Sequence, residues 1–242
     1  MLLSVIIPAY NEAKRIKKTL LTTSRYLKQQ SYDYEILVVN DGSTDKTSLV
    51  VKQLSKTVPC LRLIDNRDNH GKGWVVRQGM RETRGDYRLF MDADNSTSID
   101  QVAAMLPWFQ KGYDVVIGSR RIKGAKITVQ QPWLRDVLGA VFRLLIHILV
   151  PLAVTDSQAG FKLFSQKSAT LIFERQTIFR WAFDVELLAI AHAQGCTVKE
   201  VPIIWSNDAS SHVKISGMIN MLFEVTKIRL NLWDNLYSRS NK

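Results

Sequence analysis

Five continuous apolar runs, each bounded by turn residues, constrain the fold of this 242-residue chain more than any other feature. Runs of this kind are typical of strands buried on both faces of a parallel sheet. Segments of helix length separate them, so strand and helix alternate. This pattern predicts an α/β fold with an open, mostly parallel sheet flanked by helices. The runs lie at 2–8, 35–40, 61–65, 87–92 and 115–119, and helices are expected at 12–30, 45–58, 72–84 and 100–111.

The alternation weakens after Ser119, where a polar loop leads to residue 131. One hydrophobic core can organise a chain of this length, so we expect a single domain over residues 1–242. The second half is expected to contain an apolar segment at 137–154, strands at 161–164 and 198–205, a helix at 182–193 and a last amphipathic helix at 215–233.

Basic residues outnumber acidic ones by 33 to 22, which gives a net charge of +11. This charge implies an anionic partner such as a nucleic acid, a nucleotide or a membrane surface, without choosing among them. The apolar segment 137–154 contains Arg143 and Pro151, so it is a poor membrane span and should be interfacial or buried in the core. Cys60 and Cys196 form no disulfide or metal pattern, and the amino terminus is not a secretory signal. Both observations favour the cytoplasm.

The sequence Asp92-Ala93-Asp94 directly follows an apolar run. Two carboxylates two residues apart in extended backbone point the same way, which suits coordination of Mg²⁺ or Mn²⁺ bridging a diphosphate. A helix cap or a solvated turn is the alternative. The position at the carboxyl end of a strand favours the metal site, because open α/β sheets bind their ligands there.

A second polar cluster, residues 40–45, follows the second expected strand. Thr44 or Asp45 can cap the helix that comes next. Asp41 has no such structural explanation, and a carboxylate at a strand end can accept a ring N–H from a nucleotide base. We therefore expect Asp41 to recognise the base of a nucleotide.

Two further loops follow strands, at 8–12 and at 69–73. In the second loop, Gly71 and Gly73 allow the backbone to approach a phosphate closely, and Lys72 adds a positive charge. Gly-Lys-Gly alone is a common turn. The chain contains neither a phosphate-binding loop ending in Gly-Lys-Ser/Thr nor a Gly-x-Gly-x-x-Gly dinucleotide motif.

These four elements, one after each successive strand, resemble the family 2 glycosyltransferases of the GT-A fold. Motifs in the second half resemble the dolichyl-phosphate β-glucosyltransferase branch, which is related to the dolichyl-phosphate mannose synthases. The resemblance covers nearly the whole chain. These motifs are Gly118-Ser119-Arg120, the run from Asp156 to Phe164 and the run from Arg180 to Leu188.

The resemblance implies a donor side within residues 1–119 that binds a nucleotide diphosphate sugar. Asp92 and Asp94 would hold Mg²⁺ or Mn²⁺ on the donor diphosphate, which makes Asp94 catalytic. Asp41 would hold the base together with the loop that contains Pro8, Tyr10 and Glu12. Lys72 would lie close to the nucleotide, and Lys214 would close over the diphosphate.

The resemblance also implies an acceptor side within residues 120–210, where Arg120 and Arg135 would bind the phosphate of the acceptor. Residues 211–242 would contribute an amphipathic helix. Asp156 is the best candidate for a base if the acceptor is a hydroxyl, but a phosphate acceptor is already ionised at pH 7 and needs none.

The implied activity is an inverting transfer of a hexose, with glucose preferred, to a polyprenyl or dolichyl phosphate. UDP-glucose is the favoured donor and GDP-mannose the other. The alternative is transfer to a hydroxyl of a glycan or a lipid-linked sugar. Binding of nucleic acid is disfavoured, because carboxylates at the strand ends would repel phosphates. We expect a cytoplasmic protein that associates peripherally with the membrane surface.

Several positions depart from the family pattern. Ser96 occupies the place of a glutamine that serves as a further metal ligand in related mannose synthases, and His212-Val213-Lys214 replaces Gly-Ser-Lys. The amino-terminal membrane helix of the eukaryotic glucosyltransferases is not seen in this sequence. Asp184 and Glu186 lie on an expected helix, where a solvated face or an internal ion pair is the default interpretation.

Overall fold

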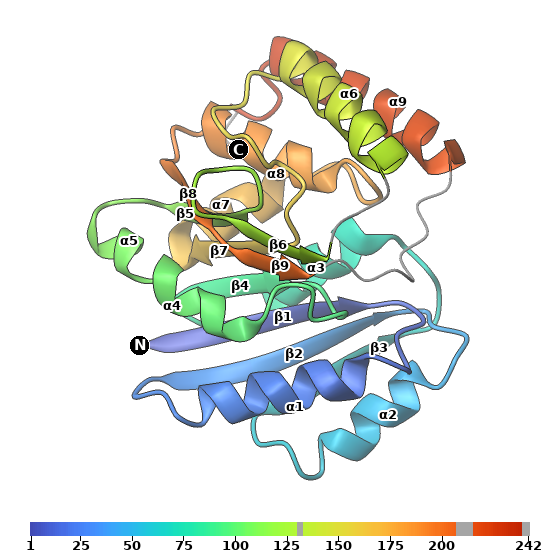
Figure 1. The fold of residues 1–242 in the computed structure, drawn as a ribbon, viewed down its shortest axis with the longest axis vertical. Helices are drawn as coiled ribbons and strands as arrows, with labels where there is room; N and C mark the ends of the chain where they lie inside the picture. The colour runs from blue at the N-terminus through green and yellow to red at the C-terminus, as the bar shows by residue number, and fades with distance from the viewer. Residues whose placement is uncertain (130–132, 207–214, 239–242) are drawn as a thin grey trace.

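The core of the fold is a seven-stranded sheet in the order β3-β2-β1-β4-β7-β5-β8 (Figure 1). The computed structural model describes residues 1–129, 133–206 and 215–238, without the side chains at 133–138, 141 and 215–219. Within these ranges six strands run parallel, and β7 runs antiparallel to its neighbours β4 and β5. This confirms the predicted α/β class with its mostly parallel sheet. The strands are β1 (Leu2–Ala9), β2 (Asp33–Asp41), β3 (Leu61–Asn66), β4 (Tyr87–Met91), β5 (Val115–Ser119), β7 (Phe161–Ser165) and β8 (Val198–Pro202).

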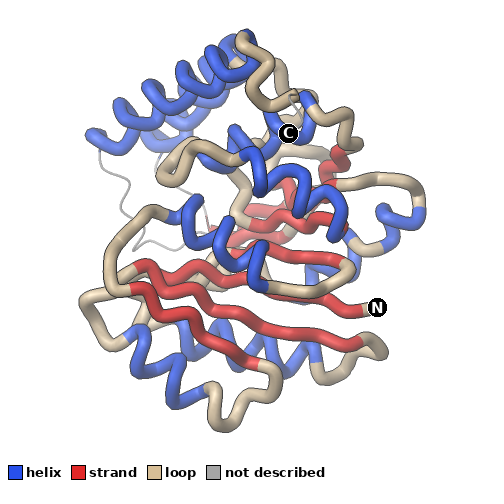
Figure 2. The backbone as a smooth tube through the Cα atoms, turned by 180° about the vertical axis from the view of Figure 1, so that it is seen from behind, coloured by secondary structure: helices blue, strands red, loops and turns tan. Residues whose placement is uncertain are grey.

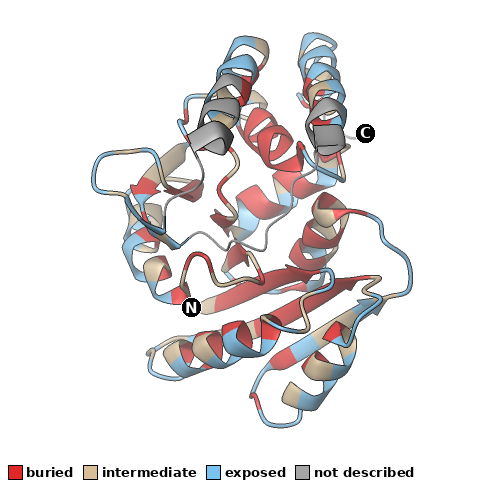
Figure 3. Ribbon diagram, turned by 45° about the vertical axis from the view of Figure 1, so that its right-hand side comes forward, coloured by how far each residue is buried: buried red, intermediate tan, exposed pale blue. Residues whose placement is uncertain are grey.

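Helices cover both faces of this sheet (Figure 1, Figure 2), and the alternation of side chains along each strand supplies both cores. In β1, Leu3, Val5 and Ile7 pack on one face, whereas Ile6 packs on the other. Figure 3 shows buried residues along the length of the central strands, as expected for strands covered on both faces. One face carries α1 (Ile16–Leu27) and α2 (Thr47–Leu54), and the other carries α3 (Lys72–Glu82), α7 (Gln166–Arg175) and α8 (Phe183–Ala193).

The prediction of a single helix at 100–111 is wrong. The structure divides it into η1 (Ile99–Gln101), α4 (Val102–Met105) and α5 (Pro107–Gln110). Proline lacks a backbone N–H and its ring clashes with the carbonyl four residues earlier, so Pro107 begins a new helix.

Two long helices in the second half, α6 (Trp133–Leu149) and α9 (Ile215–Trp233), contact each other, and α9 also packs on α8 (Figure 1). One side of each helix is buried. None of the helices within the described ranges has the length and hydropathy of a transmembrane span. The buried side chains of these helices and of the residue after α6 are Phe142, Ile146, Val150, Met221, Val225 and Ile228.

The carboxyl-terminal segment is fastened to α8 by the buried carboxylate of Glu186. It accepts hydrogen bonds from the backbone N–H groups of Thr177 (2.9 Å) and Ile178 (2.7 Å) and from the hydroxyl of Tyr237 (2.8 Å). Asn231 of α9 also donates to the Tyr237 hydroxyl at 3.0 Å. Burial raises the pKa of Glu186, although these donors act to lower it. Glu186 is therefore part of the core and not of a solvated face.

This network predicts the effect of removing one hydroxyl. Tyr237→Phe should lower the free energy of unfolding by about 1.5–3 kcal/mol, the usual contribution of a hydrogen bond to a charged group. The matched control is Tyr10→Phe, because Tyr10 is 48% exposed and should tolerate the change. Urea denaturation measures both variants, and equal stabilities would contradict this account of the Glu186 network.

Candidate active site

The loops that follow β1 and β2 are tied together at the carboxyl ends of these strands. The side-chain oxygen of Asn11 accepts the backbone N–H of Thr44 at 2.9 Å, and the N–H of Asn11 donates to Ser43 Oγ at 2.9 Å. The N–H of Glu12 donates to Thr47 Oγ1 at 2.8 Å. Asn11 has a φ of 56°, a conformation that asparagine tolerates better than most residues. The two polar motifs found in the sequence therefore form one connected rim.

Asp41 connects this rim to the loop after β3. Its carboxylate is buried and accepts the N–H groups of His70 (2.8 Å) and Gly71 (3.0 Å) and the side-chain amide of Asn69 (3.0 Å). Gly71 has a φ of 101°, which strains any other residue, and a Cβ there would lie 2.5 Å from the carbonyl oxygen of Phe179. Asp41 thus shapes the loop that presents Lys72, a role that the sequence did not indicate. Its contact with a nucleotide base stays a prediction.

Lys72, the first residue of α3, forms an ion pair with Asp92, with Nζ and Oδ1 2.6 Å apart. The ammonium group also lies 5.2 Å from the ring centroid of Phe90 and 5.9 Å from that of Phe183. Burial acts against the positive charge, but Asp92 and Asp184 outweigh it and hold the pKa of Lys72 above its usual value. Lys72 therefore stays charged beside the acidic motif.

The backbone N–H of Asp92 donates to the carbonyl of Gly160 at 3.1 Å, which fixes the acidic motif against the turn before β7. A Cβ at position 160 would lie 1.9 Å from Asp92 Oδ2, so this close approach needs glycine. Asp94 Oδ1 accepts the N–H of Ser96 at 2.9 Å. Burial raises the pKa of Asp94, and the neighbouring charge of Asp92 adds to the effect.

Glu12 is the third carboxylate of this site. Arg15 binds it with two parallel hydrogen bonds of 2.7 Å. Burial raises the pKa of Glu12, and although Arg15 lowers it, the charges of Asp94 and Asp92 raise it further. Glu12, Asp92 and Asp94 therefore crowd negative charge at one edge of the sheet.

Such a donor set fits Mg²⁺ or Mn²⁺, which proteins commonly hold through one or two carboxylates together with substrate phosphates. Among the residues that the structure describes, no group of three or more histidine, cysteine or acidic side chains could form a complete metal cage. Asp92 and Asp94 would therefore hold the ion together with oxygens from water or a bound diphosphate.

Arg120 and Asp156, expected on the acceptor side, bind each other. The guanidinium nitrogens Nε and Nη2 donate to the carboxylate at 2.8 and 2.7 Å, and the backbone N–H of Arg120 adds a third bond at 2.9 Å. The ring centroid of Trp205 lies 5.2 Å from the guanidinium carbon of Arg120. Trp205 belongs to the strand β9 (Ile204–Ser206), which pairs with β6 (Lys126–Val129). Burial would raise the pKa of Asp156, but Arg120 outweighs it and the pKa is lowered. A carboxylate of this kind is a weak base.

A buried ion pair lies beneath the site, where Lys162 of β7 donates to Asp184 of α8 and to the carbonyl of Ala159. Both side chains are almost entirely excluded from solvent. Burial lowers the pKa of Lys162 and raises that of Asp184, although each partner opposes the shift of the other. The internal ion pair considered for Asp184 is therefore present. Sequence reasoning missed Lys162, and the signal that could have found it is a lysine within the apolar run 161–164, which requires a buried partner.

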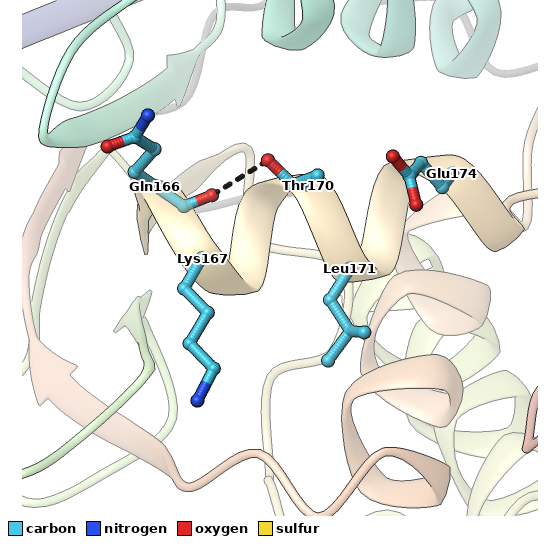
Figure 4. A pocket seen from close by; sticks show the side chains of 5 residues that line it. All are labelled: Gln166, Lys167, Thr170, Leu171 and Glu174. Atoms are coloured by element: carbon cyan, nitrogen blue, oxygen red, sulfur yellow. Dashed lines mark hydrogen bonds between the residues drawn. The ribbon is translucent and has the colours of Figure 1, made fainter. Parts of the chain in front are cut away.

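The remaining expected residues lie apart from these contacts. Pro8 lies within β1, and Tyr10 is half exposed on the rim. Arg135 lies on α6, but its side chain is outside the described residues, as is Lys214 altogether. Figure 4 shows an open depression on α7 that contains none of the expected residues. It is lined by Gln166, Lys167, Thr170, Leu171 and Glu174.

The mostly parallel seven-stranded sheet flanked by helices is a fold of the GT-A type. Among solved structures, glucosyl-3-phosphoglycerate synthase from Mycobacterium tuberculosis, in complex with Mn²⁺, UDP-glucose and phosphoglyceric acid, aligns with a TM-score of 0.67 and 18% identity. The alignment covers 99% of this chain and 81% of that one. Mannosyl-3-phosphoglycerate synthase from Rubrobacter xylanophilus aligns with a TM-score of 0.65 and 16% identity, over 100% and 77% of the two chains. At these identities the likeness concerns the fold.

The family is defined by sequence. Residues 4–172 match Glycosyl transferase family 2, and the chain belongs to that family. A dolichyl-phosphate beta-glucosyltransferase of Trichomonas vaginalis is 36% identical, over 95% of this chain and 75% of the relative. The enzyme of the same name from Mus musculus is 35% identical, over 94% and 75%. The protein is accordingly a glycosyltransferase, as its motifs predicted.

The crowded carboxylates predict that one of them can be neutralised without harm to the fold. Asp94→Asn should abolish transfer, because the metal-binding charge is lost while the volume is kept. Its melting temperature should not fall, since repulsion from Asp92 is relieved. The measurements are Mn²⁺ binding by electron paramagnetic resonance and release of nucleoside diphosphate, with exposed Asp100→Asn as control. Full activity in the presence of a chelator would remove the metal from the mechanism.

The pair of Asp156 with Arg120 predicts a loss of stability that a general base would not show. Asp156→Asn leaves a largely buried guanidinium without its partner, so the free energy of unfolding should fall by about 3 kcal/mol. Because the folded-state pKa of Asp156 is lowered, this stabilisation is present above the ordinary carboxyl pKa and is lost as the pH falls through the folded value. The difference in the free energy of unfolding between wild type and Asp156→Asn should therefore become smaller at acid pH. Lower kcat at unchanged stability would instead identify a base.

Proposed function

We propose that this protein transfers a hexose, with glucose preferred, from a nucleotide diphosphate sugar to a polyprenyl phosphate such as dolichyl phosphate, with inversion at the anomeric carbon. UDP-glucose is the favoured donor and GDP-mannose the alternative. The observation that carries the proposal is the similarity to relatives named dolichyl-phosphate beta-glucosyltransferases, which extends over both halves of the chain.

On the donor side, Asp92 and Asp94 would hold Mg²⁺ or Mn²⁺ against the diphosphate. The metal would supply positive charge that stabilises the leaving nucleoside diphosphate. Lys72, already charged and beside Asp92, would add to this charge. Asp41 and the loop containing Pro8, Tyr10 and Glu12 would hold the base.

On the acceptor side, an oxygen of the lipid phosphate would attack the anomeric carbon as the bond to the donor diphosphate breaks. That oxygen is ionised at neutral pH and needs no general base. This chemistry is compatible with an Asp156 that is engaged by Arg120. Transfer to a hydroxyl would require a base, and a carboxylate of lowered pKa is poorly suited to that task. Arg120 and Arg135 would contact the acceptor phosphate, and Lys214 would close over the donor diphosphate.

The lipid chain would meet the protein at a surface that we name the two-helix face, made by the exposed apolar side chains of α6, α9 and the turn after α9. Phe223 and Trp233 of α9 are 72% and 75% exposed, and Lys227 and Arg229 on the same helix are exposed as well. Apolar side chains with neighbouring basic residues suit reversible contact with an anionic bilayer. The members of the two-helix face are Leu144, Leu145, Ile148, Phe223, Leu230, Trp233 and Leu236.

The test is transfer from UDP-glucose and GDP-mannose to polyprenyl phosphate, with release of nucleoside diphosphate as the readout. Arg135→Ala should raise the KM for the lipid phosphate or lower kcat, while donor affinity is nearly unchanged, because an arginine fork matches phosphate oxygens. Arg25→Ala on α1 is the matched control, since Arg25 is exposed and distant from α6.

Vesicle flotation tests the predicted association of the protein with an anionic membrane surface. Wild-type protein should float with anionic vesicles at low salt and progressively less as salt rises, because the screening length shortens. If Arg135→Ala uses the lipid phosphate normally and wild type never floats, the acceptor assignment is wrong and a hydroxyl acceptor takes its place.

A further inference from the structure

Glu224 is a charged residue on the side of α9 that faces the protein. Its neighbours Met221, Val225 and Ile228 are buried against the core, whereas Phe223, one residue away, belongs to the two-helix face. One oxygen of the Glu224 carboxylate, Oε2, accepts the backbone N–H groups of both Trp181 (2.9 Å) and Ala182 (2.7 Å). The helix that carries the apolar face is thus tied by a single oxygen to the segment before α8.

This contact completes the start of α8. The first N–H groups of a helix have no partner within the helix, and α8 has no side-chain cap of its own at Ala182. The acceptor comes instead from α9, and a carboxylate is the group that a helix amino terminus favours. The position of residues 181–182 therefore depends on the position of α9.

Phe183 and Asp184, the first two residues of α8, lie near Lys72. Phe183 packs against Gly73, where a Cβ would lie 2.6 Å from the Cβ of Phe183, and its ring lies 5.9 Å from Lys72 Nζ. Asp184 binds Lys162, whose ammonium lies 5.9 Å from the ring of Phe90. Lys72 lies near that same ring, at 5.2 Å. A shift of the segment 181–184 would consequently change the surroundings of Lys72.

We propose that Glu224 is a positioning residue that couples contact between the two-helix face and a lipid surface to binding of the nucleoside diphosphate beside Lys72. The inference rests on the proposed function. A bilayer that restrains α9 restrains residues 181–184 through the two hydrogen bonds, and a nucleotide restrains the same segment from the side of Lys72. Once one ligand has ordered residues 181–184, the other loses less conformational entropy on binding. Each ligand therefore raises the affinity of the protein for the other.

The experiment measures UDP and GDP affinity by calorimetry, with Mn²⁺, in the presence and absence of vesicles of phosphatidylcholine and phosphatidylglycerol. For the nucleotide that binds, vesicles should tighten wild-type affinity by about fivefold, the lower end of typical coupling between sites. Glu224→Ala should lose this tightening, so that its affinities with and without vesicles are equal. Glu224→Asp should lose most of it, because the shorter side chain cannot reach both amides.

Glu224→Gln should keep the tightening, since both amides donate to one oxygen and glutamine retains one. Glu174→Ala, an exposed acid on α7, is the control and should also keep it. If Glu224 only stabilised α9, its substitution would lower the melting temperature without changing the ratio of the nucleotide affinities measured with and without vesicles. Because Glu224→Asp keeps the charge and most of the volume, it preserves the test if the alanine variant does not fold.

Two results would overturn the inference: wild-type affinity that is the same with and without vesicles, or full tightening in Glu224→Ala or Glu224→Asp. If wild type still floats with vesicles and glucosylates polyprenyl phosphate, only the coupling fails. If it does neither, the proposed function fails together with the coupling.

Discussion

The candidate site depends on the crowding of three carboxylates, Glu12, Asp92 and Asp94, at the carboxyl ends of β1 and β4. Burial raises the pKa values of Glu12 and Asp94, and the negative charge of Asp92 adds to both shifts. The chain places positive charge beside these carboxylates, because Lys72 pairs with Asp92 and Arg15 with Glu12. In the proposed donor complex, the metal and the diphosphate would bring both signs of charge to this site and would compensate the charges of these pairs.

The antiparallel strand β7 brings the second half of the chain to this edge. The turn before β7 places Gly160 against Asp92, and the strand itself places Lys162 beneath Phe90. A parallel strand entering from the other end would present its turn at the opposite edge of the sheet. The direction of β7 therefore decides that the Asp156 motif and the acidic motif share one site.

The parallel strands and the acidic motif were predictable because continuous apolar runs and polar strand ends are local patterns. The direction of β7 was not predictable. A short apolar run such as 161–164 fits a parallel or an antiparallel strand equally well, and its neighbours β4 and β5 are distant in sequence. The pairing of Arg120 with Asp156 joins residues 36 positions apart and was equally hidden. The break at Pro107 was visible in the sequence, because a proline inside a helical pattern ends the helix.

The engaged state of Asp156 bears on the kind of acceptor that this architecture suits. Its carboxylate receives three bonds from Arg120, and the preceding segment is held by Glu200, which accepts the N–H groups of Thr155 and Asp156. A carboxylate held in this way, with its pKa lowered by Arg120, is a weak base that orients its partner. With a weak base at this position, the proposed acceptor is required to bring a nucleophile that is already ionised. A phosphate meets that requirement and an alcohol does not, so the charge state of one aspartate links the fold to the proposed lipid phosphate acceptor.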